Sequence, residues 1–157
     1  MFKASSAILS DCGKYRYRLD RRWGDGPTCG FIMLNPSTAD ADLDDPTIRR
    51  CIGFAKREGC GALMVGNLFA FRATDPEAMA DAEDSEGPQN RHFLENMADR
   101  VDGTLIAAWG AHWMANDDVS LWVREIFGSR LMCLGKTKGG HPRHPLYVKG
   151  DTPLVPL

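Results

Sequence analysis

The chain is poor in the features that mark specialised protein classes. Its 157 residues contain no apolar run long enough to cross a bilayer, and no hydrophobic segment flanked by basic residues stands near the start. We therefore expect no membrane partner and no signal peptide. Internal repeats, low-complexity tracts and linkers are also lacking, so we expect a single domain over residues 1–157 with a core of its own.

Cysteine occurs in no pattern that suggests pairing. The five cysteines are scattered and odd in number, and no Cys-x-x-Cys spacing occurs. This pattern predicts reduced thiols in a cytoplasmic protein rather than a secreted scaffold held by disulfides. A zinc site would need ligands at a spacing that the sequence does not offer, and we predict neither a metal nor an organic cofactor.

An excess of positive charge is missing too. The formal net charge is -2, and charged residues make up 25% of the chain. This balance excludes a protein whose whole surface is cationic, as in many nucleic-acid binders. Any contact with DNA must therefore come from a local patch.

What the sequence does contain is an alternation of strands and helices. An alternating segment at residues 14–23 predicts a strand with one wet face, and apolar runs predict buried strands at residues 29–34, 62–66, 104–109 and 130–134. Helix starts are marked by Asp45-Pro46, Asp75-Pro76 and Gly87-Pro88, and a further helical stripe ends at Gly128. The alternation predicts an α/β fold, a three-layer αβα sandwich around a mainly parallel central sheet with an N-terminal antiparallel edge ribbon.

Unusual polar and aromatic residues follow each of the four buried strands. In open parallel sheets, ligands bind in the crevice beyond the carboxyl ends of the strands. We therefore predict one binding pocket at that edge of the sheet. Its candidate residues, in chain order, are Asn35, Pro36, Ser37, Thr38, Asn67, Phe69, Arg72, Trp109, Lys136, Lys138, His141, Arg143, His144 and Tyr147.

Each candidate also has a plainer interpretation. Asn35 and Asn67 either cap strand ends or read the polar edge of a base, because an amide both donates and accepts. Ser37 and Thr38 fit turn capping better than nucleophilic catalysis, since no Gly-x-Ser-x-Gly elbow surrounds them. The basic loop around His141 either contacts phosphate or is simply solvated.

Two further groups are interpreted as structural. A pair of tryptophans, Trp113 and Trp122, is expected to pack in the core. A helix cap and a solvated loop are the expected roles of the four acidic residues Asp40, Asp42, Asp44 and Asp45. The alternative is that they bind a divalent cation.

Several motifs together closely resemble the domain of unknown function 1643 family. They are LNPSTADADLDDPTIRRC, NLFAFRATDP, AWGAH and LGKTKGGHPRHPLYVK, which lie between residues 15 and 149. On these motifs the chain is identified as a member of that family. The resemblance carries no assigned activity with it.

The order of the motifs also resembles, more distantly, the uracil-DNA glycosylase superfamily. That resemblance implies a parallel sheet between helices and a base pocket at the strand ends. It implies that Asn35-Pro36 holds the attacking water, that Asn67 reads the base, and that Trp109-Gly110 closes the third strand. It implies finally that the HPRHPL loop brings a histidine against the base, and either His141 or His144 fits this role.

The chain departs from the superfamily pattern at three positions near the first strand end. Asn35 stands where the most active branch has an acid, and an amide cannot take a proton from water at neutral pH. Ser37 stands in place of a tyrosine, and Met33 in place of a glycine. The resemblance therefore implies slower catalysis than in that branch.

These observations lead to one main hypothesis and two alternatives. The main one is a glycosylase-like enzyme that hydrolyses the N-glycosidic bond of a DNA base, nucleoside or nucleotide, with Asn35 and one of the two histidines as catalytic residues. The first alternative is a module that binds a nucleotide or modified base without cleaving it. The second is a metal-dependent phosphoesterase that uses the acidic loop.

Overall fold

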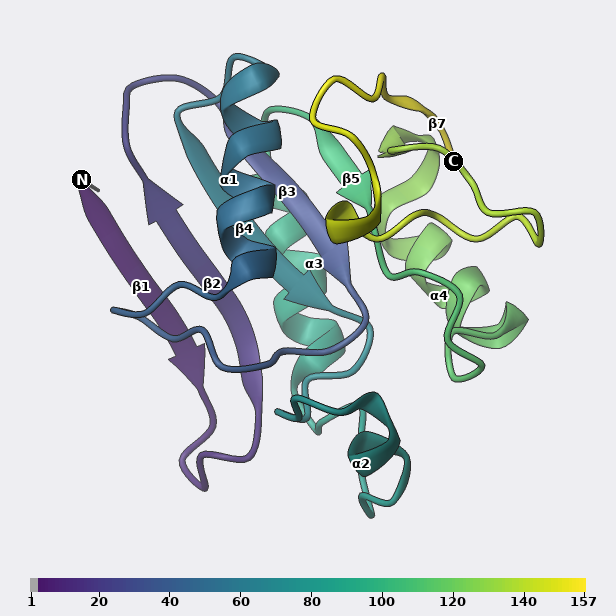
Figure 1. The fold of residues 1–157 in the computed structure, drawn as a ribbon. Helices are drawn as coiled ribbons and strands as arrows, with labels where there is room; N and C mark the ends of the chain where they lie inside the picture. The colour runs from purple at the N-terminus through teal and green to yellow at the C-terminus, as the bar shows by residue number, and fades with distance from the viewer. Residues whose placement is uncertain (1–2) are drawn as a thin grey trace.

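Figure 1 shows the protein as a computed structural model that describes residues 3–157. Within these residues the fold is a mixed α/β fold with a single sheet of seven strands, in the order β1-β2-β4-β3-β5-β6-β7. Four central strands, β4, β3, β5 and β6, are parallel, and the remaining strands add antiparallel pairs at the two edges. The bounds are β1 (Ala4–Leu9), β2 (Arg16–Arg22), β3 (Thr28–Met33), β4 (Ala62–Asn67), β5 (Leu105–Ala107), β6 (Leu131–Cys133) and β7 (Val155–Pro156).

Helices cover both faces of this sheet (Figure 1). The helices of the described chain are α1 (Pro46–Arg57), α2 (Pro76–Ala80), α3 (Asn90–Arg100) and α4 (Asp117–Phe127), with short 3-10 turns η1 (Gly128–Arg130) and η2 (Pro145–Tyr147). Side chains of α1 form one core cluster with Phe31 and Met33 of β3. Those of α3 and α4 form the other cluster with Ile32, the residue between them. Because alternate strand residues point to opposite faces, the two clusters lie on opposite sides of the sheet.

The helix that covers the first face begins where the sequence predicts it. Asp45 accepts a hydrogen bond from the backbone N–H of Ile48 at 2.8 Å, and Pro46 occupies the first helical position. Lys56 and Arg57 stand in the last turn of α1, where a positive charge complements the helix dipole. The predicted Asp-Pro helix start is thus confirmed for α1, and also for the short α2, whose cap is Asp75.

Two glycines in adjacent strands let α3 approach the sheet closely. A Cβ atom added at Gly30 would lie 2.7 Å from a methyl carbon of Leu105 in β5 and 3.1 Å from the terminal methyl carbon of Met97 in α3. One added at Gly66 would lie 2.7 Å from a methyl carbon of Leu94 in α3. Such contacts are closer than the Cβ atom of a real side chain normally makes. Glycine at these positions therefore sets the depth at which α3 packs behind β3 and β4.

Most of the predicted elements are confirmed, and one predicted core residue is wrong. The buried strands, the helices between them and the antiparallel N-terminal edge all occur. Trp113 was expected in the core but is 66% exposed, because it lies in a surface loop after β5 rather than on a packed face of α4. Trp122 does pack against the core, with the guanidinium of Arg91 4.5 Å from its ring centroid. In residues 3–157 no helix is both long and apolar enough to span a bilayer.

Candidate functional site

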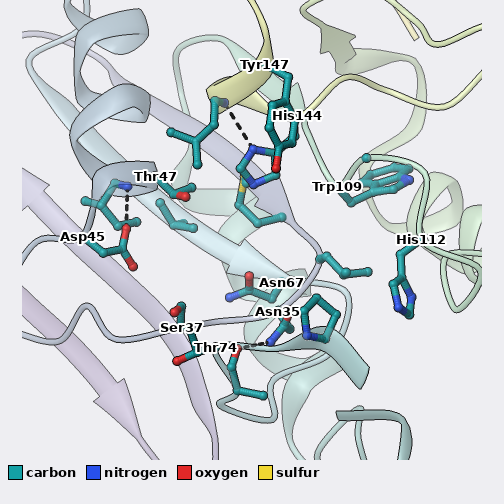
Figure 2. A pocket seen from close by; sticks show the side chains of 18 of the residues that line it. Asn35, Ser37, Asp45, Thr47, Asn67, Thr74, Trp109, His112, His144 and Tyr147 are labelled. Atoms are coloured by element: carbon teal, nitrogen blue, oxygen red, sulfur yellow. Dashed lines mark hydrogen bonds between the residues drawn. The ribbon is translucent and has the colours of Figure 1, made fainter. Parts of the chain in front are cut away.

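A pocket of about 590 Å³ opens beyond the carboxyl ends of the parallel strands. Its floor comes from the ends of β3, β4 and β5, and its walls come from the start of α1 and from the segments that follow β5 and β6. Figure 2 shows the side chains that line it. The volume is typical of sites for a small organic ligand. The location is the one that strand order predicts for an open parallel sheet.

Asn67, the last residue of β4, contributes a polar side chain that lacks a partner. It is 1% exposed, and neither its amide nitrogen nor its amide oxygen has a hydrogen-bond partner within the described chain. Its backbone is held from behind by the buried side chain of Asn90, which donates to the carbonyl oxygens of Asn67 and Leu68 at 2.9 and 3.1 Å. A buried amide without partners costs stability, and both polar atoms of Asn67 remain available to a molecule bound in the pocket.

Asn35 lies two residues past the end of β3 and is oriented by its own amide hydrogens. The side-chain nitrogen donates to the carbonyl oxygens of Pro36 and Ala73, at 3.1 and 2.9 Å. These two bonds use both amide hydrogens, so Oδ1 remains as an acceptor without a partner in residues 3–157. An acceptor held in this way can orient a water molecule or a ligand donor, but it cannot remove a proton.

His144 reaches the pocket from the segment after β6. Its Nδ1 accepts a hydrogen bond from the backbone N–H of Leu146 at 3.2 Å, which places the proton of the neutral ring on Nε2. Burial lowers the pKa of His144 below its ordinary value of 6.5, and the nearby charge of Asp45 opposes that shift. At neutral pH the ring is therefore uncharged and offers one N–H donor at Nε2.

A buried cation and a buried carboxylate lie on the α1 side of the pocket. Arg16 is 2% exposed, donates to the carbonyl oxygen of Ala39 at 2.8 Å, and has an Nε–H without a partner in the described chain. Burial lowers the pKa of Arg16 to about 10, and the charge of Asp45 opposes this shift. Arg16 therefore stays protonated at neutral pH. Asp45 is 9% exposed and, besides capping α1, accepts a longer hydrogen bond from the backbone N–H of Ala39 at 3.3 Å.

A hydrogen bond connects two segments that are separate in the sequence at the outer wall of the pocket. His112, in the loop after β5, has its Nε2 3.0 Å from Oε1 of Glu77 in α2. The Nδ1 of the same ring accepts from the backbone N–H of Met114 at 3.2 Å, so the Nε2–H donates to the carboxylate. This bond joins the rim beside Trp109 to the rim beside Pro76.

The structure brings half of the predicted site residues together. Those that line the pocket are Asn35, Ser37, Asn67, Trp109, Arg143, His144 and Tyr147. The others, which are not among the lining residues, are Pro36, Thr38, Phe69, Arg72, Lys136, Lys138 and His141. Phe69 is 7% exposed and packs in the core cluster of α3 and α4. Of the two histidines between which the sequence could not choose, only His144 lies at the pocket.

Sequence reasoning missed six polar residues that line the pocket, namely Arg16, Asp45, Thr47, Thr74, His112 and Thr137. Arg16 looked like part of a strand with one wet face, and Asp45 looked like a helix cap, with a cation ligand as the alternative. The signal that could have indicated them is charge complementarity, because an arginine-rich strand at residues 16–22 is followed by an acidic segment at residues 40–45. Opposite clusters of charge in one small domain are expected to meet.

The acidic segment is engaged with the protein itself. Asp44 forms an ion pair with the nearly inaccessible Arg21 at 2.8 Å, and Asp40 accepts from the backbone N–H groups of residues 42 and 43. Asp45 forms the predicted helix cap. No group of three or more His, Cys, Asp or Glu side chains in residues 3–157 is arranged to hold a metal ion. The geometry thus favours a structural role for the acidic loop over the divalent-cation alternative.

Comparison with known proteins identifies one family. A family model described as "Protein of unknown function (DUF1643)" matches residues 16–146, and this match over most of the chain shows the family to which the protein belongs. The identification made from the sequence motifs is confirmed. No curated protein and no solved structure matches the chain.

Proposed function

We propose that this chain, which belongs to the DUF1643 family, binds a nucleobase-containing ligand in the pocket and hydrolyses its N-glycosidic bond. The observation that carries the proposal is the buried amide of Asn67, which has no partner in the described chain. An amide offers a donor and an acceptor side by side, and the polar edge of a base presents the complementary pair. The proposal includes a distant kinship with the uracil-DNA glycosylase superfamily, supported by the order of the strand-end motifs.

The chemistry suits a bond that breaks before water attacks. As the C1′–N bond lengthens, the sugar acquires oxocarbenium character and the base leaves as an anion. The Nε2–H of neutral His144 stabilises that anion by hydrogen bonding, which is the electrostatic contribution that preorganised donors make. Water oriented by Oδ1 of Asn35 then forms the C1′–O bond, and its proton passes to the departed base. Because the oxocarbenium ion is strongly electrophilic, this route does not need a strong general base.

Trp109 and Tyr147 supply the aromatic surface of the proposed site. Trp109 is 4% exposed and lines the pocket, whereas Tyr147 is 80% exposed at its rim. Trp109 is suited to stack on the bound base, and Tyr147 to cover the part of the ligand that projects from the pocket. Arg143, which also lines the pocket, can pair with a phosphate where the ligand carries one.

A second candidate function is binding without cleavage. The specific observation in its favour is Asn35, because an amide at that position can hold water but cannot deprotonate it. Under this reading the same residues recognise a nucleotide or a modified base as a signal or a cargo. The two functions are separated by whether the wild-type protein releases the base or only binds the intact ligand.

The test is a cleavage assay on two sets of substrates. Oligonucleotides carry uracil, hypoxanthine, a mismatch or a hydroxymethylated pyrimidine, with abasic sites revealed by alkali, and free nucleosides are assayed by release of the base. We expect turnover that is lost in Asn35→Ala and is unchanged in Asn96→Ala, a substitution on α3 outside the pocket. Binding without turnover in every variant would leave only the second candidate. If no nucleobase-containing compound binds, both candidates are wrong.

A further inference from the structure

The side of the pocket remote from Asn35 has no role in the proposed cleavage. Figure 2 shows Asp45 and Thr47 on one side and Asn35 and Trp109 on the other, with Asn67 between them. If C1′ of the ligand is held near Asn35 and the base lies against Asn67, the edge of the base remote from the sugar faces Asp45. This inference therefore rests on the proposed function, and it concerns which base the site accepts.

The polar groups on that side differ in what they offer. A carboxylate only accepts hydrogen bonds, and a guanidinium only donates them. Oδ1 of Asp45 accepts from the backbone N–H of Ile48 at 2.8 Å, whereas the one hydrogen bond of Oδ2 within residues 3–157 is the longer contact with the backbone N–H of Ala39 at 3.3 Å. Arg16 retains a buried Nε–H without a partner in residues 3–157. A ligand edge that satisfies these groups must present N–H donors to Asp45 and an oxygen to Arg16 or Asn67.

The common bases differ sharply in how they meet this requirement. Guanine presents a ring N–H and an exocyclic amino group side by side, followed by a carbonyl oxygen. Uracil and thymine have a ring N–H between two carbonyl oxygens, so one oxygen would lie against the carboxylate. Adenine and cytosine have an amino group, but the neighbouring ring nitrogen is an acceptor and would also be repelled. We propose that Asp45 selects a base of the guanine type, whose ring N–H and amino group donate to its carboxylate.

The simpler interpretation is that Asp45 only caps α1. The chain contains a direct comparison, because Asp75 holds the same position before α2 and is also followed by proline. Asp75 is exposed and does not line the pocket, whereas Asp45 is buried and lines it. Capping alone does not require the Asp45 side chain to be buried within electrostatic range of the buried Arg16. The two aspartates therefore provide a matched pair of substitutions.

The experiment is calorimetric titration of wild type, Asp45→Asn and Asp75→Asn with guanosine, inosine, xanthosine and uridine. Asparagine caps a helix as well as aspartate does, so Asp45→Asn keeps the fold while it converts an acceptor into a donor. Wild type should bind guanosine about tenfold or more tightly than inosine, which lacks the amino group. Asp45→Asn should reverse the preference toward xanthosine, which carries a carbonyl oxygen in place of that amino group. Asp75→Asn should keep the wild-type order.

Each other outcome overturns the proposal in a distinguishable way. Equal binding of guanosine and inosine by wild type would show that Asp45 reads no amino group. A uniform loss of affinity in Asp45→Asn, with the order of nucleosides unchanged, would assign Asp45 a purely structural role. In both cases the proposed function stands provided that Asn67→Leu abolishes binding. If none of the four nucleosides binds and no compound of the cleavage assay binds, the proposed function fails together with this inference.

Discussion

At the scale of single residues, stability and binding make opposite demands on Asn67. Its amide is buried without a hydrogen-bond partner in the described chain. Folding therefore removes its hydrogen bonds to water without replacing them by bonds to the protein. Asn90, directly behind it, is equally buried, but its nitrogen donates to two backbone carbonyl oxygens, and only its Oδ1 lacks a partner in residues 3–157. We therefore expect the Asn67 amide to serve ligand binding and the Asn90 amide nitrogen to serve the stability of the fold.

This contrast predicts opposite effects of the same substitution at the two positions. Asn67→Leu should leave the free energy of unfolding unchanged or raise it by up to about 1 kcal/mol, because it removes an unpaired polar group. The same variant should lose ligand binding. Asn90→Leu should lower the free energy of unfolding by about 1–3 kcal/mol, because two carbonyl oxygens lose their donor. Urea denaturation measures both values, and an equal loss in both variants would contradict the prediction.

His144 predicts a pH dependence of stability. Burial lowers its pKa in the folded state, so in mildly acidic solution the unfolded chain binds a proton that the folded chain does not. The free energy of unfolding should therefore fall as the pH drops through the ordinary value of 6.5, and level off below the lowered folded-state pKa. Above that window the residue contributes no slope. The protonated ring also loses the Nδ1 acceptor that holds the Leu146 N–H.

The control for this prediction is His144→Asn. Asparagine can still accept from the Leu146 N–H but does not titrate, so the variant should show a smaller loss of stability between pH 7.5 and pH 5 than wild type. Denaturation curves at a series of pH values measure the difference. Identical slopes in the two proteins would mean that His144 does not carry the pH dependence.

The sequence predicted some of these residues and not others, for physical reasons. Asn35, Asn67 and His144 follow buried strands, and the ends of parallel strands meet at one edge of the sheet, so chain position alone brings them together. Arg16 and Asp45 gave no such signal. An arginine in an alternating strand and an aspartate before Pro46 each have a common local explanation, and their burial depends on contacts between distant segments.

At the scale of elements, helix caps and apolar runs in the sequence predict most of the helices and strands. The central strands are buried on both faces, so each appears in the sequence as a continuous hydrophobic run. The edge strands do not, because β1 is mostly exposed and β7 has only two residues, both exposed. Their pairing depends on neighbouring strands rather than on a pattern of their own. The outer edges of the sheet were therefore the least predictable part of the fold.

The cap of α1 predicts a graded effect of substitution at Asp45. Asp45→Ala removes the acceptor for the Ile48 N–H and should lower the free energy of unfolding by about 1 kcal/mol. Asp45→Asn keeps an acceptor at that position and should lie close to wild type. Chemical denaturation of the two variants provides the measurement. A large loss of stability in Asp45→Asn would show that the second carboxylate oxygen is needed for folding rather than for a ligand.

At the scale of the whole molecule, the pocket depends on a long segment that is held by distant contacts. The chain after β6 runs back to the turn η2, which lies beside α1 (Figure 1). His144, the residue before η2, lines the pocket beyond the strand ends. Arg50 of α1 donates to the carbonyl oxygens of Pro145, at 3.1 Å, and Val148. Arg57, nearly two turns further along the same helix, donates to the carbonyl oxygens of Gly150, at 3.0 Å, and Thr152. Two arginines of α1 thus hydrogen-bond to the segment at residues 145–152, Arg50 beside the pocket and Arg57 away from it.

These two sets of hydrogen bonds predict that Arg50→Ala and Arg57→Ala differ in their effects on ligand affinity and on local hydrogen exchange. Arg50→Ala should release the turn that contains His144, so the Leu146 amide should exchange its hydrogen faster and ligand affinity should fall about tenfold. Arg57→Ala removes the same kind of contact from a part of the segment that does not line the pocket, and should leave both quantities near their wild-type values. Hydrogen exchange followed by mass spectrometry detects the first effect without any ligand. Faster exchange at Leu146 in both variants would mean that the segment moves as one unit, and that His144 is positioned by the whole return path of the chain rather than by its contact with α1.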